Sequence, residues 1–143
     1  MQNYKSGSHT CYDLKYHIVW ITKYRKSIMI GQVAERLREL IRQICQANEV
    51  TIIKGHVSKD HVHLMVSASP TLSISKLVQK LKGSTSHKLF SEFAHLKQKY
   101  WGQHLWARGY FVATTGTVTD EVIMDYIANQ DVGIADDDFL IAP

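Results

Sequence analysis

Residues 49–67 read EVTIIKGHVSKDHVHLMVS, and this stretch decides the fold of the 143-residue chain. A β-branched run opens it, and residues 61–67 alternate between polar and apolar side chains, which is typical of strands. The residues between them, Ser58-Lys59-Asp60, form a tight polar turn. Two strands joined by so short a turn are predicted to pair as a β-hairpin.

Strand and helix patterns flank this hairpin. Apolar residues at every second position predict strands, and apolar residues at three- and four-residue steps predict amphipathic helices. Ser73 is expected to cap the second helix, in which Gly83 marks a break or a close approach to another segment. The predicted elements are a strand over 13–22, a helix over 31–48, strands over 49–57 and 61–67, a helix from Ser73 to about residue 93, irregular structure over 97–108, a strand over 109–115 and a helix over 119–130 capped by Thr119.

This β-α-β-β-α-β-α order predicts one α+β domain over residues 1–143. A hairpin joins the central strands and helices join the others. We therefore expect a single, mainly antiparallel sheet of about four to five strands with helices packed on it, in a ferredoxin-like arrangement. The fold class alone says little about function.

The charge is unevenly distributed along the chain. Residues 1–119 carry all 17 basic residues and six acidic ones, a net charge of +11, whereas residues 120–143 carry seven acidic residues and no basic one. A basic body is expected of a nucleic-acid-binding protein, and also of generic basic proteins. The acidic tail over 131–143 packs on a partner, shields the basic surface or forms a loosely ordered terminus.

The composition also excludes several classes of protein. With 45% hydrophobic residues, the chain has enough apolar material for a core and is not globally disordered. Two cysteines, Cys11 and Cys45, make neither a disulfide scaffold nor a cysteine-type zinc site. The N-terminus shows no signal or transit pattern, and no apolar run spans a bilayer, so we expect a cytoplasmic protein without a membrane partner.

His61 and His63 are the sharpest local feature of the sequence. Side chains two residues apart in a strand point to the same face, so the two imidazoles converge on one side of the predicted hairpin. Two convergent histidines are able to hold a divalent metal ion with positions left for other ligands. The alternative is a pair of exposed strand histidines.

Tyr126 and Gln130 lie four residues apart in the last predicted helix, and therefore on one helical face. A tyrosine hydroxyl is a candidate nucleophile, and an amide oxygen is a hard ligand suited to Mg²⁺ or Mn²⁺. The alternative is structural, because Val122, Ile123 and Ile127 place Tyr126 in an apolar stripe at the edge of a core.

Four segments in combination resemble the single-tyrosine HUH transposases, the TnpA enzymes of small insertion sequences, with the REP-associated tyrosine transposases as relatives. The resemblance spans residues 10–131, and family members commonly have proline where this chain has Lys59. Its segments are YHIVW with TKYRK over 16–26, KDHVHLMV over 59–66, WG through LW over 101–106 and YIANQ over 126–130.

The resemblance implies an HUH fold and a defined chemistry. His61, His63 and Gln130 would hold Mg²⁺ or Mn²⁺, and Tyr126 would attack a DNA phosphodiester at the end of an insertion sequence. The products would be a 5′-phosphotyrosine link and a free 3′-hydroxyl, followed by strand transfer. The implied partners are single-stranded DNA with subterminal hairpins and a second copy of the chain, as homodimers that share active sites. No general base is identified, and Asp60 is open to two interpretations, as a base and as a residue that shapes the turn.

Basic and aromatic side chains outside this set are the candidates for holding a DNA hairpin, because stacking and phosphate contacts suit exposed bases. They are Lys23, Arg25, Lys26, Lys76, Lys80, Lys82, Trp106 and Arg108.

Two other functions remain open from the sequence. One is a domesticated protein that binds hairpin DNA without transposition. The other is a basic RNA-binding domain, which is disfavoured because the central strands carry histidines and aliphatic residues where such a domain needs aromatic ones.

Overall fold

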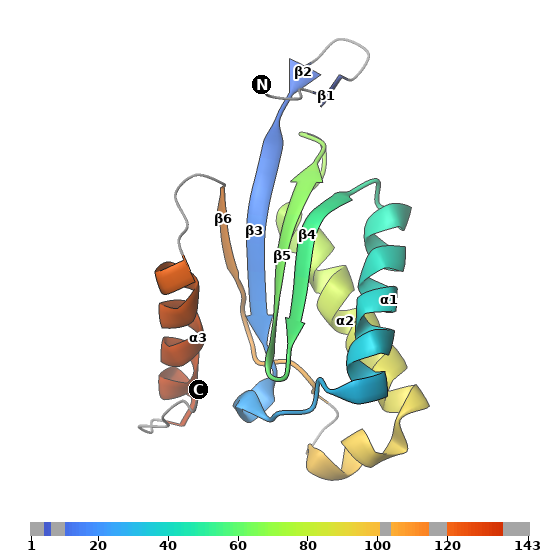
Figure 1. Ribbon diagram of the computed structural model, residues 1–143, viewed down its shortest axis with the longest axis vertical. Helices are drawn as coiled ribbons and strands as arrows, with labels where there is room; N and C mark the ends of the chain where they lie inside the picture. Colours follow the sequence, from blue (N-terminus) through green and yellow to red (C-terminus); the bar gives the residue numbers. More distant parts are fainter. Residues whose placement is uncertain (1–4, 7–10, 101–103, 115–119, 136–143) are drawn as a thin grey trace.

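The structure is a computed structural model that describes residues 5–6, 11–100, 104–114 and 120–135. Its main sheet has four strands in the order β4-β5-β3-β6, with every neighbouring pair antiparallel, and β1 pairs with β2 in a second sheet (Figure 1). The predicted α+β class is confirmed. The elements are β1 (Lys5–Ser6), β2 (Cys11–Tyr12), β3 (Leu14–Ile21), η1 (Lys23–Arg25), α1 (Gly31–Ala47), β4 (Thr51–Ser58), β5 (His61–Ala68), α2 (Ile74–Glu92), η2 (Ala94–Lys99), β6 (Phe111–Thr114) and α3 (Asp120–Ala135).

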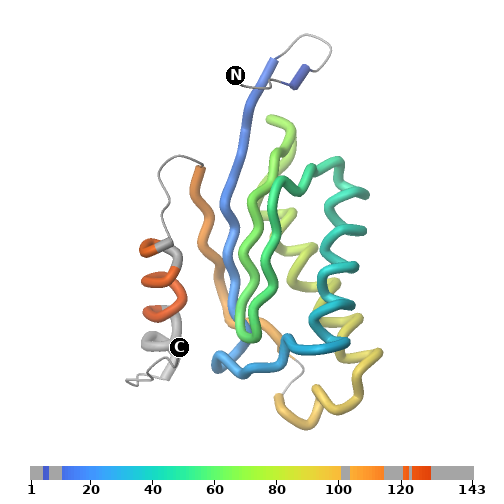
Figure 2. Tube along the Cα trace, in the orientation of Figure 1, coloured from blue at the N-terminus to red at the C-terminus, as the bar shows by residue number. Residues whose placement is uncertain are grey.

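The predicted hairpin is confirmed as the pair β4 and β5. The two strands run side by side along their length and reverse at Lys59 and Asp60 (Figure 2). Val57 pairs with Val62, and both pack against the larger core. The hairpin register therefore places the apolar positions of both strands on one face.

Strand β3 supplies both faces of the sheet with apolar side chains. Ile18 and Trp20, both 0% exposed, pack into the core beneath α1 and α2. Val19 and Ile21 alternate with them and pack with Ile127 of α3 on the opposite face. Complete burial of each such side chain stabilises the fold by roughly 1.5–3 kcal/mol. One alternating strand thus fixes a helix layer on each side of the sheet.

The helices follow the sequence pattern with local differences. The Ser73 hydroxyl caps α2 by accepting a hydrogen bond from the Lys76 amide at 3.3 Å. Gly83 does not break α2, and among the described residues a Cβ atom added at this position would meet nothing within 4 Å, so no described segment approaches it closely. Residues 94–99, which partly overlap the segment expected to be irregular, form η2. Among the described residues, no helix is both long and apolar enough to cross a membrane.

Helix α3 continues to residue 135, five residues beyond its predicted end, so the first part of the expected acidic tail is helical. Thr119, the expected cap of this helix, and residues 136–143 lie outside the described part of the chain.

Trp106, one of the residues predicted to contact DNA, lies largely in the core, where most of its ring is unavailable for stacking on a base. Its side chain is 7% exposed, and its ring meets Trp20 edge to face at 5.8 Å between centroids. The indole N–H donates a hydrogen bond to the Thr85 hydroxyl at 3.0 Å, and that hydroxyl donates to the Leu81 carbonyl. Composition alone did not separate a buried tryptophan from an exposed one.

Replacing Thr85 with valine is expected to lower the free energy of unfolding by about 1–3 kcal/mol, because the Trp106 N–H then stays buried without an acceptor. Chemical denaturation measures the loss, with the exposed neighbour Ser84→Ala as the control. Equal stability of Thr85→Val and the wild-type protein would contradict this assignment.

Candidate functional site

His61 and His63 face the side of the sheet on which α3 packs. They pair in register with Ile21 and Val19 of β3, which contact Ile127 of α3. Both imidazoles are half-buried, whereas Val62 between them is 0% exposed in the opposite core. The alternation expected from the sequence therefore brings the two imidazoles to one face.

Two further histidines flank His63, one on each neighbouring strand. His17 of β3 places its Nδ1 2.9 Å from Nε2 of His63, with the ring centroids 5.2 Å apart. His56 of β4 is the register partner of His63. A bulge between Ile52 and Lys54 shifts the alternation of β4, so His56 faces the α3 side although Ile52 faces the core.

Sequence reasoning did not place either histidine beside His63. The polar face of the strand over 13–22 contained the signal for His17, whereas a bulge has no clear sequence signal.

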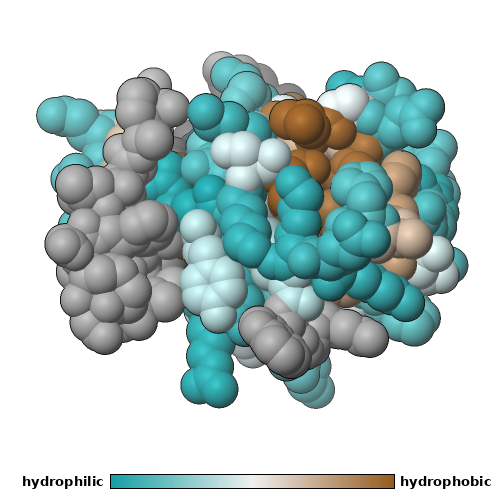
Figure 3. Space-filling model, turned by 90° about the horizontal axis from the view of Figure 1, so that it is seen from below, coloured by the Kyte–Doolittle hydropathy of each residue, from teal (hydrophilic) through white to brown (hydrophobic). Residues whose placement is uncertain are grey.

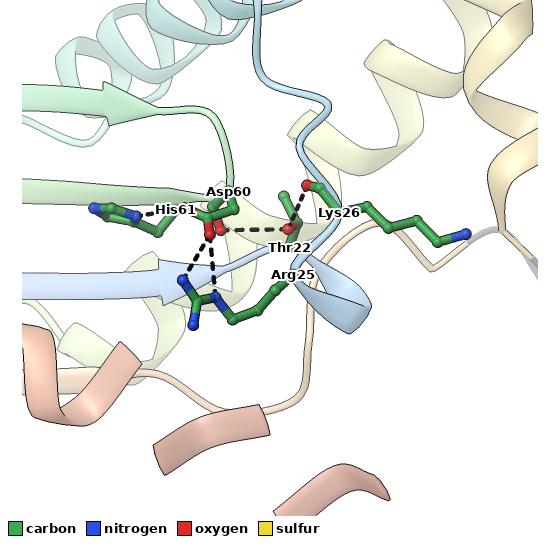
Figure 4. A network of polar contacts seen from close by, with 5 residues as sticks. All are labelled: Thr22, Arg25, Lys26, Asp60 and His61. Carbon is green, nitrogen blue, oxygen red and sulfur yellow. Dashed lines mark hydrogen bonds and ion pairs between the residues drawn. The ribbon is translucent and has the colours of Figure 1, made fainter. Parts of the chain in front are cut away.

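The side chain of Asp60 joins His61 to Arg25 (Figure 4). One carboxylate oxygen, Oδ1, lies 2.9 Å from Nδ1 of His61. The other, Oδ2, accepts hydrogen bonds from Nε and Nη2 of Arg25 at 3.1 and 2.8 Å. The side chains of Arg25 and Asp60 are only 8% and 9% exposed. This is a buried ion pair that has a candidate metal ligand as its third member.

The backbone around the ion pair is fixed by Thr22, which is 0% exposed. Its amide donates to the Asp60 carbonyl at 2.9 Å. Its hydroxyl donates to the Lys26 carbonyl at 2.9 Å and lies 3.3 Å from the Asp60 carbonyl oxygen (Figure 4). Tyr24 and Arg25 adopt φ values of 60° and 52°, in the left-handed region that costs a non-glycine residue roughly 1–2 kcal/mol. The connector after β3 is therefore a specific turn that directs Arg25 toward the hairpin.

The contacts of Asp60 and the direction of its pKa shift bear on its two interpretations. Burial alone would raise this pKa, but the hydrogen bonds from His61 and Arg25 outweigh it and hold the pKa below the ordinary value. A carboxylate that is stabilised in its ionised form is a poor general base. The contacts of Asp60 therefore favour the interpretation in which it shapes the turn.

A pocket of about 770 Å³ separates this network from α3. The hairpin side contributes Arg25, Asp60 and His61, and α3 contributes Asp125 and Ile127 among others. Tyr126 is not among the described residues that line this pocket. Its half-buried ring packs against Phe111 of β6, with 5.3 Å between the ring centroids.

The donor set fits a metal ion only in part. His61 presents Nε2 outward because its Nδ1 contacts Asp60, and His63 shares the face. Among the described residues, no group of three or more His, Cys, Asp or Glu side chains is arranged to hold a metal. Another ligand is required, and the side chain of Gln130, the expected third ligand, lies outside the described part although its backbone belongs to α3.

The chain is similar to known proteins over most of its length. The family model described as "Transposase IS200 like" matches residues 10–130, which include every candidate ligand and Tyr126. The chain belongs to the IS200-like transposase family. It is 37% identical over 126 residues to the ISDra2 transposase TnpA of Deinococcus radiodurans, covering 88% of this chain and 90% of that protein. It is 36% identical over 130 residues to the IS200 transposase of Salmonella typhimurium, covering 91% and 85%.

Solved structures confirm the fold of this IS200-like transposase. A crystal structure from Deinococcus radiodurans R1 superposes with a TM-score of 0.83 at 39% identity and covers 88% of this chain and 97% of that chain. A REP-associated tyrosine transposase bound to a REP hairpin superposes with a TM-score of 0.55 at 17% identity, covering 94% and 75%, which is a likeness of fold.

The basic residues predicted to contact DNA occupy different environments in the transposase. Arg25 is buried against Asp60, and Lys82 donates to the carbonyls of Ala107 and Gly109, with burial lowering its pKa. The others lie nearer solvent. Lys23 and Lys26 flank the exposed ring of Tyr24, Lys76 and Lys80 are exposed on α2, Lys80 bonds to Asn48, and Arg108 is exposed.

At a pH of about 10.5 we expect the Tyr126 hydroxyl to remain protonated, because burial raises its pKa to about 12 from the ordinary value of about 10. NMR of protein labelled at the tyrosine ζ carbon measures this titration, with Tyr126→Phe assigning the signal. Phe111→Ala should expose the ring and lower the pKa of Tyr126. An unchanged pKa in Phe111→Ala would contradict the role given to this packing.

Proposed function

We propose that this chain is a metal-dependent transposase that acts on single-stranded DNA through Tyr126. The observation that carries the proposal is the placement of His61 and His63 on one face of β5, with His61 held by Asp60 and with the helix of Tyr126 packed on the same face. The match of residues 10–130 to the IS200-like transposase family supports the transposase activity in this proposal.

In the proposed reaction, the phenolic oxygen of Tyr126 attacks a phosphorus atom at an end of the insertion sequence. The bond to the 3′-oxygen breaks, which leaves a free 3′-hydroxyl, and the 5′ side is linked to the tyrosine. Attack by a 3′-hydroxyl on this phosphotyrosine then joins strands and releases Tyr126. Each step exchanges one phosphodiester for another, so no external energy source is needed.

The imidazoles of His61 and His63 and the amide of Gln130 are the proposed ligands for Mg²⁺ or Mn²⁺. When bound, the ion would supply Lewis-acid stabilisation of the phosphate oxygens and orient the leaving 3′-oxygen. The two histidines would hold that ion on the face of β5 that looks toward α3.

The proposed substrate is a single strand with subterminal hairpins. The basic character of residues 1–119, with a net charge of +11, supports this substrate. Tyr24 is 45% exposed and lies 5.3 and 5.8 Å from the Lys23 and Lys26 ammonium groups, which suits one stacked base between two phosphates. The end of the molecule that carries the hairpin turn is largely hydrophilic, with one apolar patch (Figure 3).

We expect a homodimer in which Tyr126 of one copy serves the histidines of the other. The packing of Tyr126 against Phe111, away from the lining of the pocket beside His61, supports this arrangement.

Incubation with an end-labelled hairpin strand and Mn²⁺ should give a covalent protein–DNA adduct. We expect Tyr126→Phe to lose all detectable adduct and Tyr12→Phe, a matched change in β2, to retain it. Hairpin binding without an adduct at any Mg²⁺ or Mn²⁺ concentration would overturn the transposase proposal and favour the domesticated hairpin binder.

Mixing Tyr126→Phe with His61→Ala protein tests the shared site. If subunits exchange randomly, about a quarter of all sites combine an intact tyrosine with intact histidines, and adduct formation should recover to that level. A mixture in which every chain lacks Tyr126 is the control. No recovery after demonstrated subunit exchange would place each site within one chain.

A further inference from the structure

We propose that Asp60 and Arg25 are positioning residues that fix the tautomer and orientation of His61, so that its Nε2 faces the metal ion. This inference rests on the proposed function and deepens it. It assigns a role to the basic connector and to the aspartate before the two histidines, neither of which is itself a proposed ligand.

The contacts of the carboxylate carry the argument. Oδ2 of Asp60 is occupied by the two donors of Arg25, at 3.1 and 2.8 Å, and Oδ1 lies 2.9 Å from Nδ1 of His61. An ionised carboxylate only accepts hydrogen bonds, so the proton of the neutral imidazole resides on Nδ1. The lone pair on Nε2 is then free for a metal ion. Partners of this kind orient metal-ligating histidines and raise their basicity.

Burial turns these contacts into a rigid support. Arg25 and Asp60 keep 8% and 9% of their side chains exposed, whereas Arg36 and Glu39, an ion pair on α1, keep 26% and 60%. Two residues in the left-handed region and the Thr22 contact to the Asp60 carbonyl at 2.9 Å hold the guanidinium and the turn together. The connector after β3 and the turn between β4 and β5 together set the position of Arg25.

The competing role for Arg25 is direct contact with a DNA phosphate. Its Nε and Nη2 already donate to Asp60, and withdrawing them would leave a buried carboxylate without its cation. The geometry favours the positioning role, and the two roles differ in one measurable respect. Only a positioning residue changes His61 and the metal affinity when no DNA is present.

The first test reads the tautomer of His61 in metal-free protein from long-range ¹H–¹⁵N NMR correlations. We expect the Nδ1–H form in the wild-type protein. In Asp60→Asn the amide oxygen stays with Arg25 and the amide NH₂ faces His61, so the Nε2–H form should become dominant. Asp13→Asn, which breaks the Lys15–Asp13 ion pair near the start of β3, is the matched control and should leave the tautomer unchanged.

The second test measures Mn²⁺ affinity by calorimetry without DNA. We expect Asp60→Asn and Arg25→Gln each to weaken binding roughly 10–100-fold, in the range seen for changes to the partners of metal ligands. Arg25→Lys should recover part of the loss because it keeps the charge. Arg36→Lys, on the exposed pair of α1, should bind Mn²⁺ like the wild-type protein. The double variant Arg25→Gln, Asp60→Asn should be no weaker than Asp60→Asn, because Arg25 acts through Asp60.

A wild-type tautomer and wild-type Mn²⁺ affinity in folded Asp60→Asn would overturn the proposal. Losses that multiply in the double variant would also overturn it, since Arg25 would then act by a separate route. If Asp60→Asn does not fold, the Mn²⁺ affinity of Arg25→Gln decides, and a wild-type affinity in that variant would overturn the proposal. Failure of the proposed function looks different: the wild-type protein would form no DNA adduct, while the tautomer of His61 still responded to Asp60.

Discussion

The carboxylate of Asp60 is the group on which the candidate site depends. It joins the connector after β3 to the hairpin turn and to the first histidine of β5, three parts that the fold brings together at one edge of a pocket. A buried ion pair contributes little net stability because desolvation of both charges offsets their attraction, whereas loss of one partner costs about 3–5 kcal/mol. The pair with Arg25 therefore specifies geometry more than it stabilises the fold.

The two faces of the sheet differ in apolar burial, and this difference allows the polar network to form on one of them. On the α1 and α2 side, Ile18, Trp20 and Val62 are fully buried in the larger core. On the α3 side, the apolar contacts with α3 form a much smaller cluster, and four histidines, His17, His56, His61 and His63, lie on the same face. Because one face supplies most of the apolar burial, the other is able to carry groups whose burial is unfavourable.

Periodicity in the sequence predicted the four strands of the main sheet, the three α-helices and the shared face of His61 and His63, because side-chain alternation and helical spacing are local properties. It did not predict the short strands β1 and β2 or the two 3₁₀ helices. It did not predict the contact of Arg25 with Asp60, which lie 35 residues apart, nor the burial of Trp106 against Thr85. A basic or aromatic composition is the same whether a side chain meets solvent or the core. The end of α3 was also misplaced, since no proline follows residue 130 to stop the helix before residue 135.

The electrostatics of the proposed reaction follow from the same network. Tyr126 lies in the part of the chain without basic residues, and burial against Phe111 makes its hydroxyl harder to ionise. A phosphate that approaches His61 would be repelled by the neighbouring carboxylate if that charge were unpaired. Arg25 compensates the charge of Asp60 through Oδ2, and Oδ1 keeps its contact with His61. The positive field of the basic body would then act on the phosphate without opposition from Asp60, the proposed positioning residue.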